Sequence, residues 1–181
     1  MGISTTSLTL IISSLACFAV ITGISTFHFT RKGAVPLGAM IISLAAVSSV
    51  GVFVWCAWTN PGNALIPLPL YAAALILFLW TIRTTRRRDF VLAFTKIVPG
   101  ALTVDGPYAY IRHPFYVSYL VYHFANALAT TALLPWLMFA IMLAIYIVAA
   151  RGEEQFLAQG EYKNEYGAYR RRTGMFLPRL W

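Results

Sequence analysis

Charged side chains are scarce in this sequence. Only 11% of the 181 residues are charged and just six are acidic, whereas 59% are hydrophobic and the mean hydropathy is +0.69. An ordinary soluble domain carries charge on about a quarter of its residues. This scarcity excludes an ordinary soluble domain and indicates an integral membrane protein.

Cysteine is nearly absent as well. Cys17 and Cys56 both lie inside apolar runs, which provides neither a disulfide framework nor the paired spacing of a metal site. We interpret both as small packing residues and expect no bound metal. The basic stretch that opens a signal peptide is also missing from the N-terminus, so we expect the first apolar segment to be retained as a helix.

Long apolar runs dominate what is present. A transmembrane helix needs roughly 20 mainly apolar residues, and five segments meet or approach this length: 5–29, 35–58, 64–82, 114–130 and 133–150. We therefore predict an all-α polytopic membrane protein with about five transmembrane helices, the last two forming a tight hairpin. We expect two parts: three N-terminal helices in 1–82, and a catalytic half in 83–181 that ends in a cytoplasmic helical lid.

Charge is confined to one end of this predicted bundle. All 14 Lys and Arg residues and all six acidic residues fall in the first connection, the third connection or the C-terminal tail. The positive-inside rule makes that end cytoplasmic and the N-terminus external, with a bacterial inner (plasma) membrane as the expected location. We attribute the net charge of +8 to this topology and to lipid head groups, not to nucleic acid.

The first polar cluster lies at the start of the fourth predicted helix, in "VDGPYAYIRHPFYVSYLVYHFANAL". Pro114 suits an early helical position, where its missing N–H has no cost. Polar residues then recur at steps of three and four: Tyr116, Tyr119, His123 and Asn126. Polar groups at membrane depth face the bundle interior or a cavity, although His123 and Asn126 also suit simple hydrogen bonding between helices.

The second cluster follows the fifth predicted helix. Glu153 and Glu154 are adjacent, so their side chains point about 100° apart and only one need face a cavity. A solvated helix end balanced by Arg151 is the alternative interpretation. The tail behind them carries Tyr162, Tyr166 and Tyr169 and ends "MFLPRLW", and such an aromatic tail predicts a lid folded against the membrane face.

Together the two clusters predict a pocket with a cationic end at Arg112 and His113, an anionic end at the glutamates, and aromatic faces. A zwitterionic sulfonium ligand with a flat base fits this description. S-adenosylmethionine is such a ligand.

The motifs "GPYAYIRHPFY" at 106–116 and "EEQFL" at 153–157, with a Tyr-rich tail closing on Leu-Pro, resemble the isoprenylcysteine carboxyl methyltransferase and phospholipid methyltransferase superfamily. The resemblance covers roughly residues 95–181. It implies S-adenosylmethionine binding at the cytoplasmic face and a methyl acceptor arriving from the bilayer. We assign cofactor binding to Tyr108, Tyr110, His113, Pro114, Tyr116, Glu154 and Asn126, and catalysis to Arg112, Glu153 and His123.

The expected substrate is a lipophilic or lipidated molecule, such as an isoprenylcysteine-type carboxylate or a similar lipid. A carboxylate acceptor needs no general base, whereas an amine or hydroxyl acceptor needs one, for which Glu153 and His123 are the candidates. Two alternatives remain open. One is an NADPH-dependent membrane sterol or enone reductase whose nucleotide phosphate contacts Arg86 to Arg88, and the other is a non-catalytic membrane scaffold.

Overall fold

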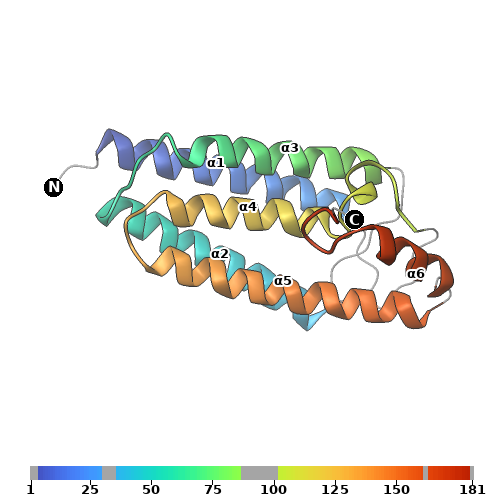
Figure 1. Cartoon of the computed structure of the whole chain (residues 1–181). Helices are drawn as coiled ribbons and strands as arrows, with labels where there is room; N and C mark the ends of the chain where they lie inside the picture. The colour runs from blue at the N-terminus through green and yellow to red at the C-terminus, as the bar shows by residue number, and fades with distance from the viewer. Residues whose placement is uncertain (1–3, 30–35, 87–101, 161–162, 180–181) are drawn as a thin grey trace.

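The computed structural model describes residues 4–29, 36–86, 102–160 and 163–179, and the regular structure of these residues is helical apart from isolated bridges (Figure 1). The elements are α1 (Thr5–His28), α2 (Leu37–Thr59), α3 (Pro67–Thr85), the short 3-10 helix η1 (Gly106–Ala109), α4 (Pro114–Leu128), α5 (Leu134–Gln159) and α6 (Lys163–Arg172). The predicted all-α polytopic fold is confirmed. Several residues used in the sequence predictions fall outside the described ranges: Arg31, Lys32, Arg87, Arg88, Lys96 and Tyr162.

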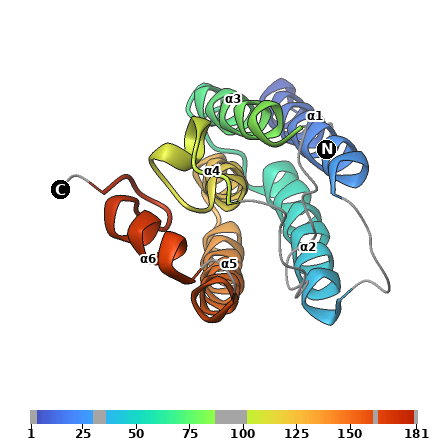
Figure 2. The ribbon, with the colours of Figure 1, turned by 90° about the vertical axis from the view of Figure 1, so that its right-hand side faces the viewer.

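Four of these helices, α1, α2, α3 and α5, are long and apolar enough to cross a membrane. The remaining helix of the bundle, α4, has only 15 residues and lies between α2, α3 and α5 (Figure 2). Most of its residues are buried in protein. The fourth predicted span is therefore a short central helix, while α5 runs nine residues beyond the end predicted for it at 150.

The turn before α4 fixes where this central helix begins. Gly106 has a φ of +58°, a backbone conformation that residues other than glycine rarely adopt. A Cβ at Gly106 would also lie 2.3 Å from the hydroxyl of Thr84 on α3. Because the turn packs this closely on α3, the chain enters the bundle at His113, and Pro114 occupies the first position of α4.

The core contains side chains from both predicted parts of the chain, 1–82 and 83–181. Its main cluster takes side chains from α1, α2, α3 and α4: Cys17, Ile21, Val50, Tyr71, Ala74, Phe78, Phe115, Tyr122 and Ala125. Cys17 and Cys56 are both buried and free, as expected of packing residues.

The two ends of the bundle differ in charge. At one end α1, α3 and α5 finish, and α6 lies beside them (Figure 1). This end, here called the charged end, carries the described charged side chains, among them Arg83, Arg112, Glu154 and those of α6. At the uncharged end, the loops after α2 and α4 are tied by backbone hydrogen bonds from Gly62 to Ala129 (2.9 Å) and from Thr131 to Asn60 (3.2 Å). That the charged end faces the cytoplasm stays a prediction.

Candidate functional site

A buried ion pair joins the start of α4 to the end of α5. The Nε of Arg112 donates to Oε1 of Glu154 at 2.7 Å, and the two side chains are only 8% and 5% exposed. Another guanidinium nitrogen of Arg112 donates to the carbonyl of Thr173, beyond the end of α6. One arginine thus links α4, α5 and the C-terminal tail, and a planar guanidinium is the cation best suited to such divergent contacts.

His113 lies between the two adjacent glutamates. Its Nδ1 is 3.5 Å from Oε2 of Glu153, and its Nε2 is 3.3 Å from Oε1 of Glu154. Burial by itself would lower the pKa of His113, but the hydrogen bonds and charges of the two carboxylates outweigh burial and raise its pKa. The arrangement therefore favours an imidazolium that donates from both ring nitrogens.

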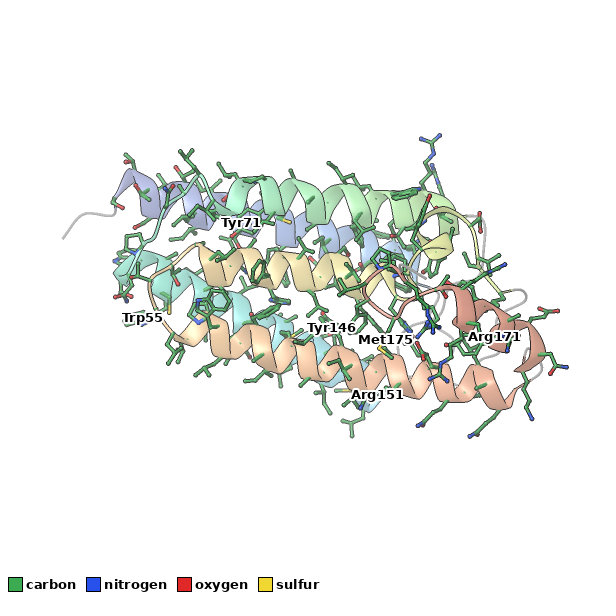
Figure 3. The ribbon with its side chains drawn as sticks, in the orientation of Figure 1. Trp55, Tyr71, Tyr146, Arg151, Arg171 and Met175 are labelled. Atoms are coloured by element: carbon green, nitrogen blue, oxygen red, sulfur yellow. The ribbon has the colours of Figure 1, made fainter. Side chains whose placement is uncertain are left out.

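Aromatic rings form one wall of the site. The Tyr116 hydroxyl donates to Oε1 of Glu153 at 2.5 Å, and its ring stacks on His113 with centroids 5.5 Å apart and planes 6° from parallel. Tyr146 also stacks on Tyr116, with ring centroids 5.0 Å apart. Its side chain points inward between α4 and α5 (Figure 3). Tyr146 was not among the predicted site residues, although it lies seven residues, or two helical turns, before Glu153 on the same face of α5.

The tail after α6 pairs with the segment before α4 through its backbone. Arg112 N donates to the carbonyl of Gly174 at 2.8 Å, His113 N to that of Met175 at 3.2 Å, and Gly174 N to that of Tyr110 at 3.3 Å. A Cβ at Gly174 would lie 1.7 Å from the carbonyl oxygen of Leu177, so no other residue fits this turn without rearrangement. The predicted folding back of the tail is therefore observed as a short backbone ladder on the Arg-His motif, and that the tail covers the membrane face stays a prediction.

Two tyrosines of α6 turn toward the site. The hydroxyl of Tyr169 donates to the carbonyl of Tyr108 at 2.7 Å, and burial raises its pKa to about 12. Tyr166 is 2% exposed and its hydroxyl has no hydrogen-bond partner among the described residues. Burial, reinforced by the charge of Glu154, raises the pKa of Tyr166, which keeps this hydroxyl protonated and able to donate.

Three predicted cofactor residues hold the backbone in place. Tyr108 is buried and Tyr110 is exposed; the carbonyl of Tyr108 accepts from α6 and that of Tyr110 from the tail. Pro114 is fully buried at the first turn of α4. Their assignment to cofactor binding stays a prediction. Arg112, His113, Tyr116, Glu153 and Glu154 do come together, and we call them the charged cluster.

His123 and Asn126 lie further along α4, in a second group of polar residues. His123 Nδ1 is 3.1 Å from the hydroxyl of Ser49 on α2. Oδ1 of Asn126 accepts from Ser14 on α1 at 2.9 Å and from Tyr71 on α3 at 2.6 Å. We call this group the neutral cluster, and its members are Ser14, Ser49, Tyr71, Tyr122, His123 and Asn126. Its described hydrogen bonds tie helices together and none reaches the glutamates.

An open pocket of about 500 Å³ is lined by Arg112 but by none of the aromatic wall residues. We call it the arginine pocket. It is lined by α6, the tail and the segment before α4: Arg112, Gly167, Arg170, Arg171, Thr173, Gly174, Leu177, Pro178 and Arg179.

Comparison with known proteins places this site in a family. The family model for phospholipid methyltransferases matches residues 63–165, more than half of the chain, from just before α3 into the start of α6. All five residues of the charged cluster fall within the match. A curated relative, the cobalt-zinc-cadmium resistance protein CzcN of Cupriavidus metallidurans, is 40% identical over 86 residues. That alignment covers 45% of this chain and 37% of the relative, so the chain spans little more than a third of that protein.

Proposed function

The chain belongs to the phospholipid methyltransferase family, and from this premise we propose that it uses S-adenosylmethionine to methylate a lipophilic acceptor at the charged end of its bundle. The observation that carries the proposal is His113, whose side chain is 10% exposed and lies between Glu153 and Glu154 while Arg112 pairs with Glu154. Paired cationic and anionic groups beside stacked aromatic rings suit a zwitterion that also bears a positive sulfur.

The residues present fit this methyl donor. Arg112 and His113 are the groups to hold its carboxylate, and Glu153 is the group to hold its ammonium. The buried Tyr166 hydroxyl has no partner among the described residues, and a buried donor of this kind is expected to have one when the site is filled. Bound S-adenosylmethionine supplies an electrophilic methyl carbon that passes to the acceptor as one bond to sulfur breaks and one to the acceptor forms.

The two glutamates differ in what they can do. Glu154 is 4% exposed and already contacts Arg112 and His113, so its role is to hold those two side chains in place. The side chain of Glu153 is 34% exposed, which leaves this carboxylate accessible. We propose that Glu153 contacts the ligand and accepts a proton when the acceptor is an amine or a hydroxyl. An isoprenylcysteine-type carboxylate needs no such base.

The remaining catalytic candidate, His123, is better explained as a packing residue. Its ring contacts Ser49 within the bundle, and ten residues, about 15 Å of helix, separate it from His113. We assign Asn126 to packing for the same reason. The proposed machinery is therefore the charged cluster together with Tyr146 and Tyr166.

The first test is titration of the detergent-purified full chain with S-adenosylhomocysteine in a calorimeter. His113→Ala and Glu154→Gln should each weaken binding roughly ten- to a hundred-fold, as expected for loss of a charge-assisted hydrogen bond. His123→Gln is the matched control and should leave affinity unchanged, because it alters a buried histidine of the same helix outside the charged cluster. Binding of NADPH instead of S-adenosylhomocysteine would favour the reductase alternative, and binding of neither would favour a scaffold.

The second test addresses the acceptor. The apolar surface of the bundle makes the bilayer the expected route for the methyl acceptor. Purified protein is incubated with labelled S-adenosylmethionine and either a total membrane lipid extract or the aqueous metabolite fraction. Label should enter the lipid product. Label in water-soluble product alone would contradict the lipophilic acceptor and leave methyl transfer intact.

A further inference from the structure

The arginine pocket is lined by positively charged side chains. Four arginines line it, at positions 112, 170, 171 and 179, and no acidic side chain is among its lining residues. Glu154 partly neutralises two of the four, Arg112 and Arg170. Its oxygens lie 2.7 Å from Nε of Arg112 and 3.7 Å from Nε of Arg170.

Arg171 and Arg179 have no such compensation, since no ion pair to either occurs in the part of the chain that the structure describes. A guanidinium nitrogen of Arg179 donates to the backbone carbonyl of Arg171 at 2.8 Å. This contact holds the tail against α6 and brings two uncompensated cations to one cavity, where they repel each other. An anion bound between them would be attracted to both cations and would offset their mutual repulsion.

The charge of the pocket does not suit the methyl donor. S-adenosylmethionine has two positive groups and one negative group, and the charged cluster already offers it both signs. Planar guanidinium groups match the oxygens of phosphate in paired hydrogen bonds. Leu177 and Pro178 add an apolar side to the pocket, which suits a phosphate that is attached to carbon.

We propose that the arginine pocket is a binding site for a phosphate-type anion, separate from the methyl-donor site and adjoining it at Arg112. The phosphate belongs to a lipid head group or to a soluble phosphate ester, which share the chemistry that the pocket recognises. This inference goes beyond the proposed methyl transfer, because it rests on Arg171 and Arg179, which the proposed machinery does not use.

The test compares single arginine variants of the full chain in detergent. Binding of inorganic phosphate is measured by calorimetry, and binding of short-chain phosphatidic acid is measured against phosphatidylcholine by native mass spectrometry. Arg171→Gln and Arg179→Gln should each weaken binding roughly tenfold, as for a lost charge-assisted contact. Arg172→Gln is the matched control: it removes the same charge from the next position of α6, where the guanidinium lies over the Tyr169 ring and outside the pocket.

The two probes separate the sources of the phosphate. Binding of phosphatidic acid with little affinity for inorganic phosphate identifies a lipid head group, and the reverse identifies a soluble ester; both support the site. Equal losses in Arg171→Gln and Arg172→Gln would reduce the effect to general surface charge and overturn the proposal. So would binding of neither probe by the wild-type chain.

Titration with S-adenosylhomocysteine keeps this proposal distinct from methyl transfer. Arg171→Gln should bind the nucleoside as the wild type does. If that variant loses S-adenosylhomocysteine and the wild type does not bind phosphate, the pocket belongs to the methyl donor and the anion site is refuted. If the wild type binds phosphate and no nucleoside, the anion site stands and the proposed function fails.

Discussion

Both clusters take residues from α4 or from just before it, and each contains a histidine whose side chain is largely shielded from solvent. In the charged cluster, the partners of His113 come from α5 and are carboxylates. In the neutral cluster, the partner of His123 is the hydroxyl of Ser49 on α2, and the neighbouring bonds of Asn126 also go to hydroxyl groups. Partner chemistry therefore distinguishes the two histidines better than burial does. Ionised partners suit the binding of a charged ligand, and neutral hydroxyl groups suit the joining of helices within a membrane.

The largest difference should follow from removing the carboxylate that organises the charged cluster. Glu154→Gln leaves Arg112 and His113 without their shared counter-charge. Breaking a buried ion pair by removing one partner typically costs about 3 to 5 kcal/mol. We therefore expect Glu154→Gln to lower the free energy of unfolding by about 3 kcal/mol. Denaturant unfolding in mixed micelles would measure it. A loss no greater than that caused by Ser14→Ala would show that the two clusters are energetically alike.

A smaller effect should follow from changing the shape of the cation while keeping its charge. Arg112 donates to Glu154 through Nε and to the Thr173 carbonyl through another nitrogen, and a lysine ammonium cannot reproduce this fork. Arg112→Lys should weaken S-adenosylhomocysteine binding by about tenfold, equivalent to about 1.4 kcal/mol. Arg170→Lys is the control, because the Arg170 side chain is 59% exposed and its contact with the same glutamate is longer, at 3.7 Å. Unchanged affinity in Arg112→Lys would mean that charge alone matters at Arg112.

The charged cluster should also respond to pH. Because the pKa of His113 is raised in the folded protein, its stabilising contribution is fully present below its unfolded pKa of about 6.5 and is lost as pH rises through the folded value. The difference in melting temperature between wild type and His113→Gln should therefore be largest near pH about 6 and shrink toward alkaline pH. A difference that grows with pH would contradict an imidazolium held by the glutamates.

The smallest effect should come from the neutral cluster. Ser14→Ala removes one hydroxyl that bonds Asn126 and Tyr122. Hydrogen bonds between helices in membranes contribute about 0.6 kcal/mol on average, so the melting temperature should fall slightly and nucleoside affinity should not change. A tenfold loss of affinity in this variant would place the neutral cluster within the ligand site.

The sequence predicted the broad architecture because apolar length and charge placement are strong signals. It also predicted that residues 112–116 and Glu153–Glu154 belong together, although family resemblance contributed to that inference. The pairing of the tail with the Arg-His motif was not predictable, because it uses backbone atoms of Gly174 and Met175, and backbone hydrogen bonds leave no side-chain signature. The sequence left open whether His123 lines the site or bonds between helices, because a polar stripe shows which face is buried and does not show which neighbouring helix each residue meets.

The length of α4 has a consequence for how a lipid meets this protein. Its 15 residues rise about 22 Å, some 8 Å less than the roughly 30 Å thickness of a hydrocarbon core. The uncharged end of α4 is tied to the loop after α2, so we expect the shortfall at the other end, where Arg112 and His113 lie. We therefore expect the charged cluster to be recessed toward the acyl chains. A lipid can present its polar group there without being extracted into water, a step that would cost about 0.8 kcal/mol for each CH₂ group exposed.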